Sequence, residues 1–217
     1  MFLLIIVSVI VFVLYKFFKN NKVNFKSFFH KGFKLEKGMW GNACYHGKQG
    51  SGKTASVMDF IFDNVSEDYP LYANVKSIKG IKYTYFSGLQ GFYDILDSGA
   101  HNCIILFDEI FNLFPKGTKI PEKFMSFLSQ MRKRKIYFIT TAQEWLLINI
   151  DLRKFCRYSI KCKCFNIPFI GAVSYKSISN AEEIKWSQDE QEYVSPLICN
   201  TISKLNLSNL SRYEKNF

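Results

Sequence analysis

A glycine-rich octapeptide is the strongest chemical signal in this sequence of 217 residues. It fits the pattern GxxxxGK[ST] and consists of Gly47, Lys48, Gln49, Gly50, Ser51, Gly52, Lys53 and Thr54. Glycines let backbone N–H groups surround phosphate oxygens, and the N-terminus of a following helix favours the same anion. In such a loop we expect Lys53 to contact the β- and γ-phosphates of ATP, and the Thr54 hydroxyl to bind Mg²⁺.

Two adjacent carboxylates supply the second half of an ATP site. Asp108 and Glu109 directly follow the apolar run 103–107, which is typical of a buried parallel strand. Open α/β sheets bind their ligands at the carboxyl ends of such strands. We therefore predict that Asp108 holds Mg²⁺ and that Glu109 acts as general base toward the attacking water.

Four further polar residues are candidates for supporting roles. Gln143 follows the apolar run 136–141, where it would either sense the γ-phosphate or form a strand-end hydrogen bond. Arg132, Arg134 and Arg153 are candidate arginine fingers toward a neighbouring subunit. For the basic run 132–135 the alternative is that these cations complement a helix C-terminus.

Alternating strands and helices must position these residues. A short buried strand is expected over residues 40–45, directly before the glycine-rich loop. After the loop, Val57, Met58, Ile61 and Val65 recur at helical spacing. With the later strands, this order predicts a three-layer αβα P-loop NTPase of the additional-strand, RecA/FtsK-like type over residues 38–165.

The C-terminal extension, residues 166–217, carries no catalytic signal. Residues 158–165 and 167–177 are predicted to pair as a hairpin at the sheet edge, with Gly171 in the turn. Leu197, Ile198, Ile202 and Leu205 indicate a short amphipathic helix after Pro196. The six cysteines include no CxxC pair, so reduced thiols are expected rather than a metal site.

The N-terminal residues 1–18 are predicted to form an uncleaved transmembrane helix. Their apolar run has no preceding positive charge, and Lys16 and Lys19 would extend toward the lipid surface. Residues 19–37 follow as a basic juxtamembrane linker and contribute to the formal net charge of +11, which favours a lipid surface as partner. The chain is therefore expected to cross the cytoplasmic membrane once. The positive-inside rule then places the NTPase domain on the side of the membrane that faces the cytoplasm.

The chain resembles the zonular occludens toxin family over roughly residues 38–160. The glycine-rich loop, Asn74 within 71–75, the run ILFDE followed by Phe114 and Pro115, and the segment from Arg132 through 140–143 to Arg153 carry this resemblance. The family includes the morphogenesis ATPases of filamentous bacteriophages. In its typical members the transmembrane helix follows the ATPase domain, whereas here the apolar segment precedes it.

The resemblance implies an ATPase of the host cell membrane that drives filamentous phage assembly and the export of single-stranded DNA. Its expected partners are that DNA and the phage coat proteins. Its expected assembly is a homo-oligomeric ring such as a hexamer, as in the related FtsK–HerA translocases.

Two other functions fit the same sequence. One is a membrane-bound translocase for DNA packaging or conjugation, which uses the same chemistry on a different cargo. The other is a nucleotide-gated membrane scaffold without significant turnover. Glu109 argues against the scaffold, because a protein that only binds ATP does not need a general base beside the Mg²⁺ ligand.

Overall fold

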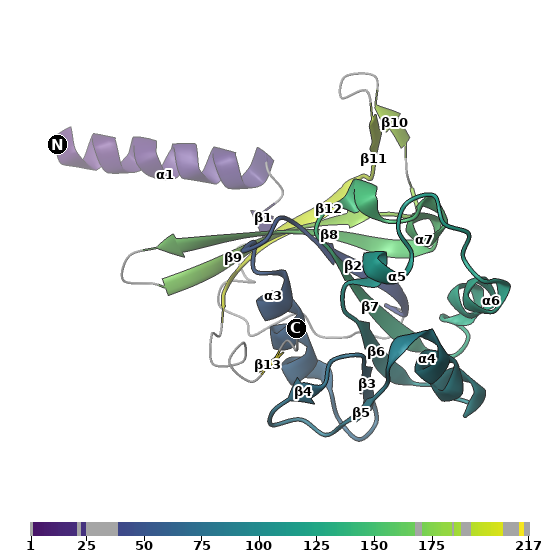
Figure 1. Cartoon of the computed structure of the whole chain (residues 1–217). Helices are drawn as coiled ribbons and strands as arrows, with labels where there is room; N and C mark the ends of the chain where they lie inside the picture. The colour runs from purple at the N-terminus through teal and green to yellow at the C-terminus, as the bar shows by residue number, and fades with distance from the viewer. Residues whose placement is uncertain are drawn as a thin grey trace.

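A mixed, mainly parallel sheet forms the middle of the protein (Figure 1). The computed structural model describes residues 2–20, 23–24, 39–167, 171–183, 185–187, 192–205 and 213–214. Within these residues the sheet has nine strands in the order β1-β12-β9-β8-β2-β7-β6-β3-β5. Their bounds are β1 Val23–Asn24, β2 Gly41–His46, β3 Leu71–Ala73, β5 Tyr83–Tyr85, β6 Cys103–Phe107, β7 Ile136–Ala142, β8 Cys156–Ile167, β9 Gly171–Asn180 and β12 Leu197–Lys204.

The parallel part of the sheet sets the position of the ATP site. All neighbours from β8 to β5 pair in parallel, so their carboxyl ends meet at one edge. β7 lies between β2, which leads into the glycine-rich loop, and β6, which leads into the two acids. This intervening strand confirms the predicted additional-strand arrangement. Every residue of β6 and β7 is buried, as expected for strands covered on both faces.

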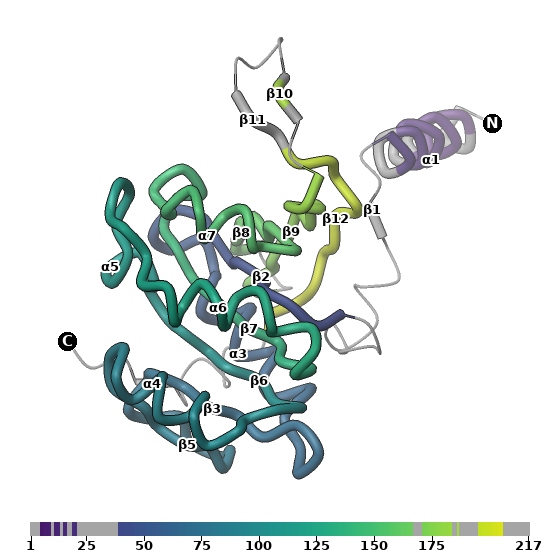
Figure 2. The backbone as a smooth tube through the Cα atoms, turned by 90° about the vertical axis from the view of Figure 1, so that its right-hand side faces the viewer, coloured from purple at the N-terminus to yellow at the C-terminus, as the bar shows by residue number. Residues whose placement is uncertain are grey.

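Helices cover both faces of this sheet (Figures 1 and 2). α3 (Lys53–Asn64) packs on one face, and Val57, Met58 and Ile61 join the core there. The second core, on the opposite face, takes in residues of four helices: α4 (Gly88–Asp97), α5 (Ile110–Leu113), α6 (Glu122–Gln130) and α7 (Ile150–Lys154). The predicted three layers are therefore present.

Phenylalanines dominate the core beneath α4 and α6. Phe92 of α4 is fully buried, and its ring centroid lies 4.9 Å from that of Phe127 and 5.2 Å from that of Phe124. Both partners belong to α6, and Phe138 of β7 completes the cluster. The two helices are thus tied to each other and to the central strand by aromatic contacts.

Six further elements complete the described part of the chain. They are α1 (Phe2–Asn20), the 3₁₀ turn η1 (Trp145–Leu147), β4 (Ser77–Ile78), β10 (Lys185–Ser187), β11 (Glu192–Val194) and β13 (Tyr213–Glu214). β10 and β11 form an antiparallel pair, and β13 pairs with β4.

The C-terminal predictions are partly corrected. The hairpin is present, with Ile167 opposite Gly171, but β12 and β1 continue the sheet beyond it, so it is not an edge. The predicted helix after Pro196 is wrong, because residues 197–204 form β12, antiparallel to β9. A short segment containing β-branched residues pairs with a free strand edge in preference to forming an isolated helix.

The predicted membrane pass over residues 1–18 is contradicted. Among the described residues, no helix is long and apolar enough to span a membrane. In α1 the apolar run ahead of Lys16 amounts to about 21 Å of helix, against a hydrocarbon core of about 30 Å. The predicted location in a membrane and its cytoplasmic-side orientation depended on this pass and are corrected with it. Most of the predicted juxtamembrane linker, residues 21–22 and 25–37, lies outside the described residues.

Candidate active site

The glycine-rich loop, called the P-loop below, connects the buried strand β2 to the N-terminus of α3. Its backbone has positive φ at Gly47 (151°), Gly50 (77°) and Gly52 (79°). A Cβ atom at Gly47 would lie 2.6 Å from the carbonyl oxygen of Cys162 and 2.6 Å from Ser51 Oγ, so a side chain there would collide. The local geometry therefore requires glycine and leaves the backbone open to phosphate oxygens.

Lys53 holds its ammonium group inside the loop. Its Nζ donates hydrogen bonds to the carbonyl oxygens of Gly47 (2.6 Å) and Lys48 (3.0 Å). These two carbonyls keep the cation at the position where phosphate oxygens would approach the loop. A bound phosphate would compete for the same donor with a full negative charge.

The two predicted acids lie at the carboxyl end of β6, beside Thr141 of β7. The Thr141 hydroxyl donates to Asp108 Oδ1 (2.5 Å) and accepts a hydrogen bond from the backbone N–H of Glu109 (2.8 Å). One neutral side chain on the intervening strand therefore orients both members of the acid pair. Sequence reasoning placed Thr141 in the strand and gave it no role.

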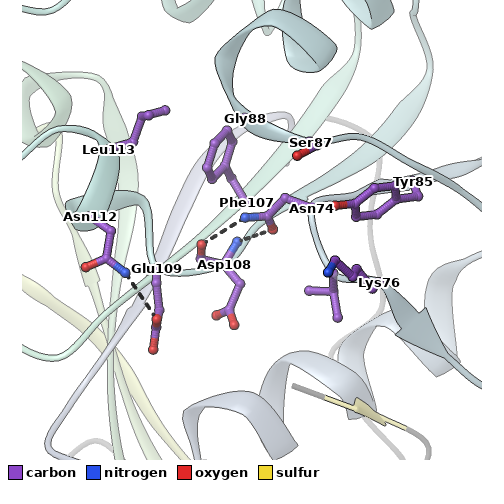
Figure 3. Close-up of a pocket in the computed structure, with 11 residues that line it drawn as sticks. Asn74, Lys76, Tyr85, Ser87, Gly88, Phe107, Asp108, Glu109, Asn112 and Leu113 are labelled. Carbon is purple, nitrogen blue, oxygen red and sulfur yellow. Dashed lines mark hydrogen bonds between the residues drawn. The ribbon is translucent and has the colours of Figure 1, made fainter. Parts of the chain in front are cut away.

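Asn74 fixes the acids from the other side, as Figure 3 shows. Its Oδ1 accepts from the backbone N–H of Asp108 (2.7 Å), and its Nδ2 donates to the Asp108 carbonyl oxygen (3.0 Å). The signal for this role was available, because Asn74 directly follows β3, the strand on the far side of β6 from β7. A polar residue at the carboxyl end of a neighbouring parallel strand can reach the same edge.

Glu109 has an unusual backbone conformation. Its φ is +55°, in the left-handed region of backbone conformation that residues other than glycine and asparagine rarely adopt. This turn separates β6 from α5, and the Glu109 carboxylate accepts a hydrogen bond from Asn112 (3.2 Å). Such conformations concentrate at functional sites, where neighbouring contacts hold them.

A cavity of 220 Å³, called the P-loop cavity here, brings the predicted residues together. It is lined by Gln49, Gly50, Lys53, Thr54, Asp108, Glu109, Phe111, Thr141, Ala142 and Gln143. A carboxylate and a hydroxyl from Asp108 and Thr54 are hard oxygen donors on one cavity, which is the chemistry that Mg²⁺ prefers. Lys53 is the one cation among the described lining residues.

A second cavity, of 360 Å³, lies along the same acids (Figure 3). Asp108 and Glu109 line it together with Asn74 and Lys76, which follow β3, with Tyr85 of β5, and with Ser87 just before α4. The acid pair thus forms a wall between two cavities. P-loop residues line the P-loop cavity, whereas the described lining of the second cavity includes no P-loop residue.

The supporting candidates are placed differently. Gln143 lies exposed just after β7 and reaches the P-loop cavity. Arg132 forms an ion pair with Glu182, and Arg134 donates to the carbonyl oxygen of Leu96 (3.1 Å). Both precede β7 at the end of the sheet away from the P-loop. Arg153 lies in α7, shortly before β8 begins, and also does not line the P-loop cavity among its described residues.

The cysteines nearest the site are protonated core groups. Burial raises the pKa of Cys44 to about 12 and that of Cys162 to about 11. All six cysteines are free. At neutral pH neither Cys44 nor Cys162 therefore supplies a thiolate.

A solved structure has a fold similar to that of this chain. The N-terminal domain of zonular occludens toxin from Neisseria meningitidis has a similar structure, with a TM-score of 0.57 at 19% identity over 81% of this chain and 100% of that one. The predicted resemblance is thereby confirmed at the level of the fold.

Two weaker structural similarities are also found. The DNA-packaging ATPase B204 of Sulfolobus turreted icosahedral virus aligns with a TM-score of 0.48 at 12% identity, covering 72% of this chain and 97% of that one. The ATPase DotB of Legionella pneumophila aligns with a TM-score of 0.45 at 13% identity, covering 67% of this chain and 47% of that one. A comparison with curated protein sequences gives no match.

A family model gives the assignment. The model of the ATPase family associated with various cellular activities matches residues 43–164, which is more than half of the chain and contains the P-loop, both acids and Thr141. The protein is an ATP-binding enzyme that hydrolyses ATP. The chain therefore belongs to the ATPase family associated with various cellular activities.

Proposed function

We propose that this ATPase hydrolyses Mg²⁺-ATP in the P-loop cavity and drives the export of single-stranded DNA during filamentous phage assembly. The observation that carries the catalytic part is the shared cavity of Lys53, Thr54, Asp108 and Glu109. The resemblance of the segments around and after the acids to the phage morphogenesis ATPases supports the cargo, as does the zonular occludens toxin fold.

Each residue has a defined part in this proposal. Thr54 and Asp108 hold Mg²⁺, which neutralises charge on the β- and γ-phosphates. Lys53 leaves the loop carbonyls and binds the same phosphates. Glu109 accepts a proton from the attacking water, and Gln143, at the rim of the cavity, orients that water or contacts the γ-phosphate.

The proposal includes a ring of identical chains. Stabilising the transition state of phosphoryl transfer commonly takes a second cation, and Lys53 is the one cation among the described residues of the P-loop cavity. Arg132, Arg134 and Arg153 lie away from the cavity of their own chain, so any of them would act on a neighbouring copy.

Glu109→Gln tests the catalytic assignment. The amide keeps the shape of the side chain but accepts no proton, so ATP binding should persist while the hydrolysis rate falls by about 10²- to 10⁴-fold. Lys53→Ala is the matched comparison, because it should abolish ATP binding itself. Fluorescent-nucleotide binding and phosphate release would be measured on all three proteins. Hydrolysis at the wild-type rate by Glu109→Gln would refute the role of Glu109.

The cargo is tested in cells that produce the phage. With Glu109→Gln, single-stranded DNA should accumulate inside the cell and few virions should be released, because the motor binds ATP but does not turn it over. Quantifying intracellular single-stranded DNA and released particles measures both effects. Normal virion release would exclude export as the function and direct attention to another DNA cargo.

A further inference from the structure

A third cavity, of 650 Å³, lies against the P-loop, and outside the P-loop only Gln143 of its described lining has a part in the ATP chemistry proposed above. We call it the rear cavity. Of the P-loop it touches Gly47, Lys48 and Ser51, whereas the P-loop cavity touches Gln49, Gly50, Lys53 and Thr54. The remaining lining is His46, Gln143, Glu144, Trp145, Leu146, Ser159, Lys161, Cys162, Lys163, Ser177, Ser179 and Ser195.

One wall of the rear cavity is a basic and hydroxyl-rich strip on the β8–β9 hairpin. Ser159, Lys161 and Lys163 alternate along β8, so they share one face of the strand. Across the antiparallel register Ser159 lies opposite Ser179, and Lys161 lies opposite Ser177. The intervening residues Ile160, Cys162 and Ile178 belong to the core shared with α3. Because side chains alternate between the faces of a strand, the strip faces away from α3, on the other side of the sheet.

The surroundings of His46 indicate a positive potential in this cavity. His46 is 8% exposed, its Nε2 lies 2.9 Å from Ser159 Oγ, and its ring centroid lies 5.5 Å from that of Trp145. Burial lowers its pKa to about 4, with further contributions from the charges of Lys161 and Lys53. At neutral pH His46 is therefore uncharged, while Lys48, Lys161 and Lys163 carry positive charge against the single carboxylate of Glu144.

The lining also includes an aromatic side chain and an unpaired hydroxyl. Trp145 is half-buried and borders the cavity beside the exposed Leu146. Ser51 Oγ is buried and has no hydrogen-bond partner among the described residues. Lysines and hydroxyls suit phosphate oxygens, and an indole ring suits the face of a base. The volume falls in the range of roughly 300–1,000 Å³ that is typical of ligand sites.

We propose that the rear cavity binds single-stranded nucleic acid, with its phosphates on the β8–β9 strip and a base against Trp145. That this nucleic acid is the exported cargo rests on the proposed function. That the rear cavity binds nucleic acid rests only on the residues that line it. Three lysines and a row of serines match a polyanion, and the ring supplies the stacking surface that single-stranded binders use without reading sequence.

The placement of the cavity couples such a ligand to ATP. Gln143 lines both the rear cavity and the P-loop cavity. The backbone N–H of Gly47, at the start of the P-loop, donates to the carbonyl oxygens of Ala142 (3.3 Å) and Gln143 (3.1 Å). A nucleic-acid strand bound in the rear cavity would therefore contact the junction between β7 and the P-loop. Because such coupling is reciprocal, bound ATP should change the affinity for the strand by the same factor as the strand changes the affinity for ATP.

The test uses the purified full chain and the double variant Lys161→Gln with Lys163→Gln. Both lysines are exposed, so the fold should be retained, which circular dichroism would check. The probe is a fluorescently labelled single-stranded oligodeoxynucleotide. The variant should lose about tenfold or more in affinity, and the magnitude of the slope of log affinity against log salt should fall by about 1.4, which is about 0.7 for each lost contact with a single strand. Lys116→Gln with Lys119→Gln, also exposed but outside the cavity, is the charge-matched control and should change affinity by less than about threefold.

Further measurements separate the possible outcomes. Equal binding of an RNA strand would support the site and assign it to the phosphate backbone. Oligonucleotide affinity that falls no further in the cavity variant than in the control would overturn the proposal, as would loss of ATP binding by the cavity variant. If the wild-type protein bound no single strand, the rear-cavity proposal would fail while the Glu109→Gln result would stand. A normal hydrolysis rate in Glu109→Gln would instead sink the proposed catalysis and leave the cavity intact.

Discussion

At the scale of single residues, neutral side chains hold the acids of this site in place. Asp108 receives a hydrogen bond from Thr141 on one side, and Asn74 holds its backbone on the other. Thr141 and Asn74 are uncharged, so neither side chain can replace the negative charge of Asp108 or Glu109. Their contribution is orientation, and orientation of a metal-binding carboxylate is measurable in metal affinity.

Replacing Thr141 with valine tests this orientation. Valine keeps the shape but removes the hydroxyl, so the Asp108 carboxylate and the Glu109 N–H each lose a partner. We expect the apparent affinity for Mg²⁺ in ATP hydrolysis to fall about 10- to 100-fold. A Mg²⁺ titration of the hydrolysis rate measures it, with Thr118→Val, an exposed hydroxyl outside the site, as control. An unchanged Mg²⁺ dependence would contradict the role of Thr141.

His46 gives a prediction in pH. Its pKa is about 4 in the folded chain and about 6.5 when unfolded, because burial disfavours the charged ring. Between these values the unfolded chain binds the proton and the folded chain does not. Stability is therefore complete above pH 6.5 and is lost as pH falls toward 4. The loss at pH 5 should be about 2 kcal/mol.

Urea unfolding at pH 7 and pH 5 measures this loss, and His46→Gln should remove it. The exposed His101→Gln is the control and should keep the wild-type pH dependence. If His46→Gln and the wild-type protein lost the same free energy of unfolding between the two pH values, the assignment to His46 would be wrong.

At the scale of elements, the aromatic cluster joins α4 and α6 to β7. Phe92→Ala would leave a cavity among Phe124, Phe127 and Phe138, and should lower the free energy of unfolding by about 3–5 kcal/mol. Phe165→Ala is the matched control, because that ring is 52% exposed. Chemical denaturation of both variants measures the difference. Equal stability of the two would show that the cluster does not hold these helices.

The sequence predicted most of the features that depend on residues close together in the chain. The P-loop, the apolar run before Asp108 and the spacing in α3 are short-range signals, and each lies where it was expected. The role of Asn74 depends on β3 lying beside β6. Asn74 and Asp108 are 34 positions apart, so short-range sequence signals do not predict their contact. The strand at 197–204 was missed for the same reason, because the edge of β9 that it pairs with is distant in sequence. The membrane helix was inferred from the apolar run within residues 1–18 and the lysines after it, but among the described residues no helix is long and apolar enough to span a membrane.

At the scale of the whole molecule, the sheet places the residues that line the P-loop cavity at one edge and leaves the candidate arginines elsewhere. If a neighbouring copy supplies an arginine, hydrolysis per chain should rise at least about tenfold as the protein concentration crosses that of assembly. Hydrolysis rates across a dilution series, compared with size measured by light scattering, check this. Activity per chain that stays constant on dilution to monomer would show that the site is complete in one chain.

The left-handed backbone at Glu109 has a consequence for the history of the protein. A conformation of this kind costs about 1–3 kcal/mol, and glycine or asparagine would relieve part of it. Selection for resistance to unfolding alone would therefore favour losing the glutamate. If Glu109 is the proposed general base, its presence at this position means that turnover is maintained at the expense of stability.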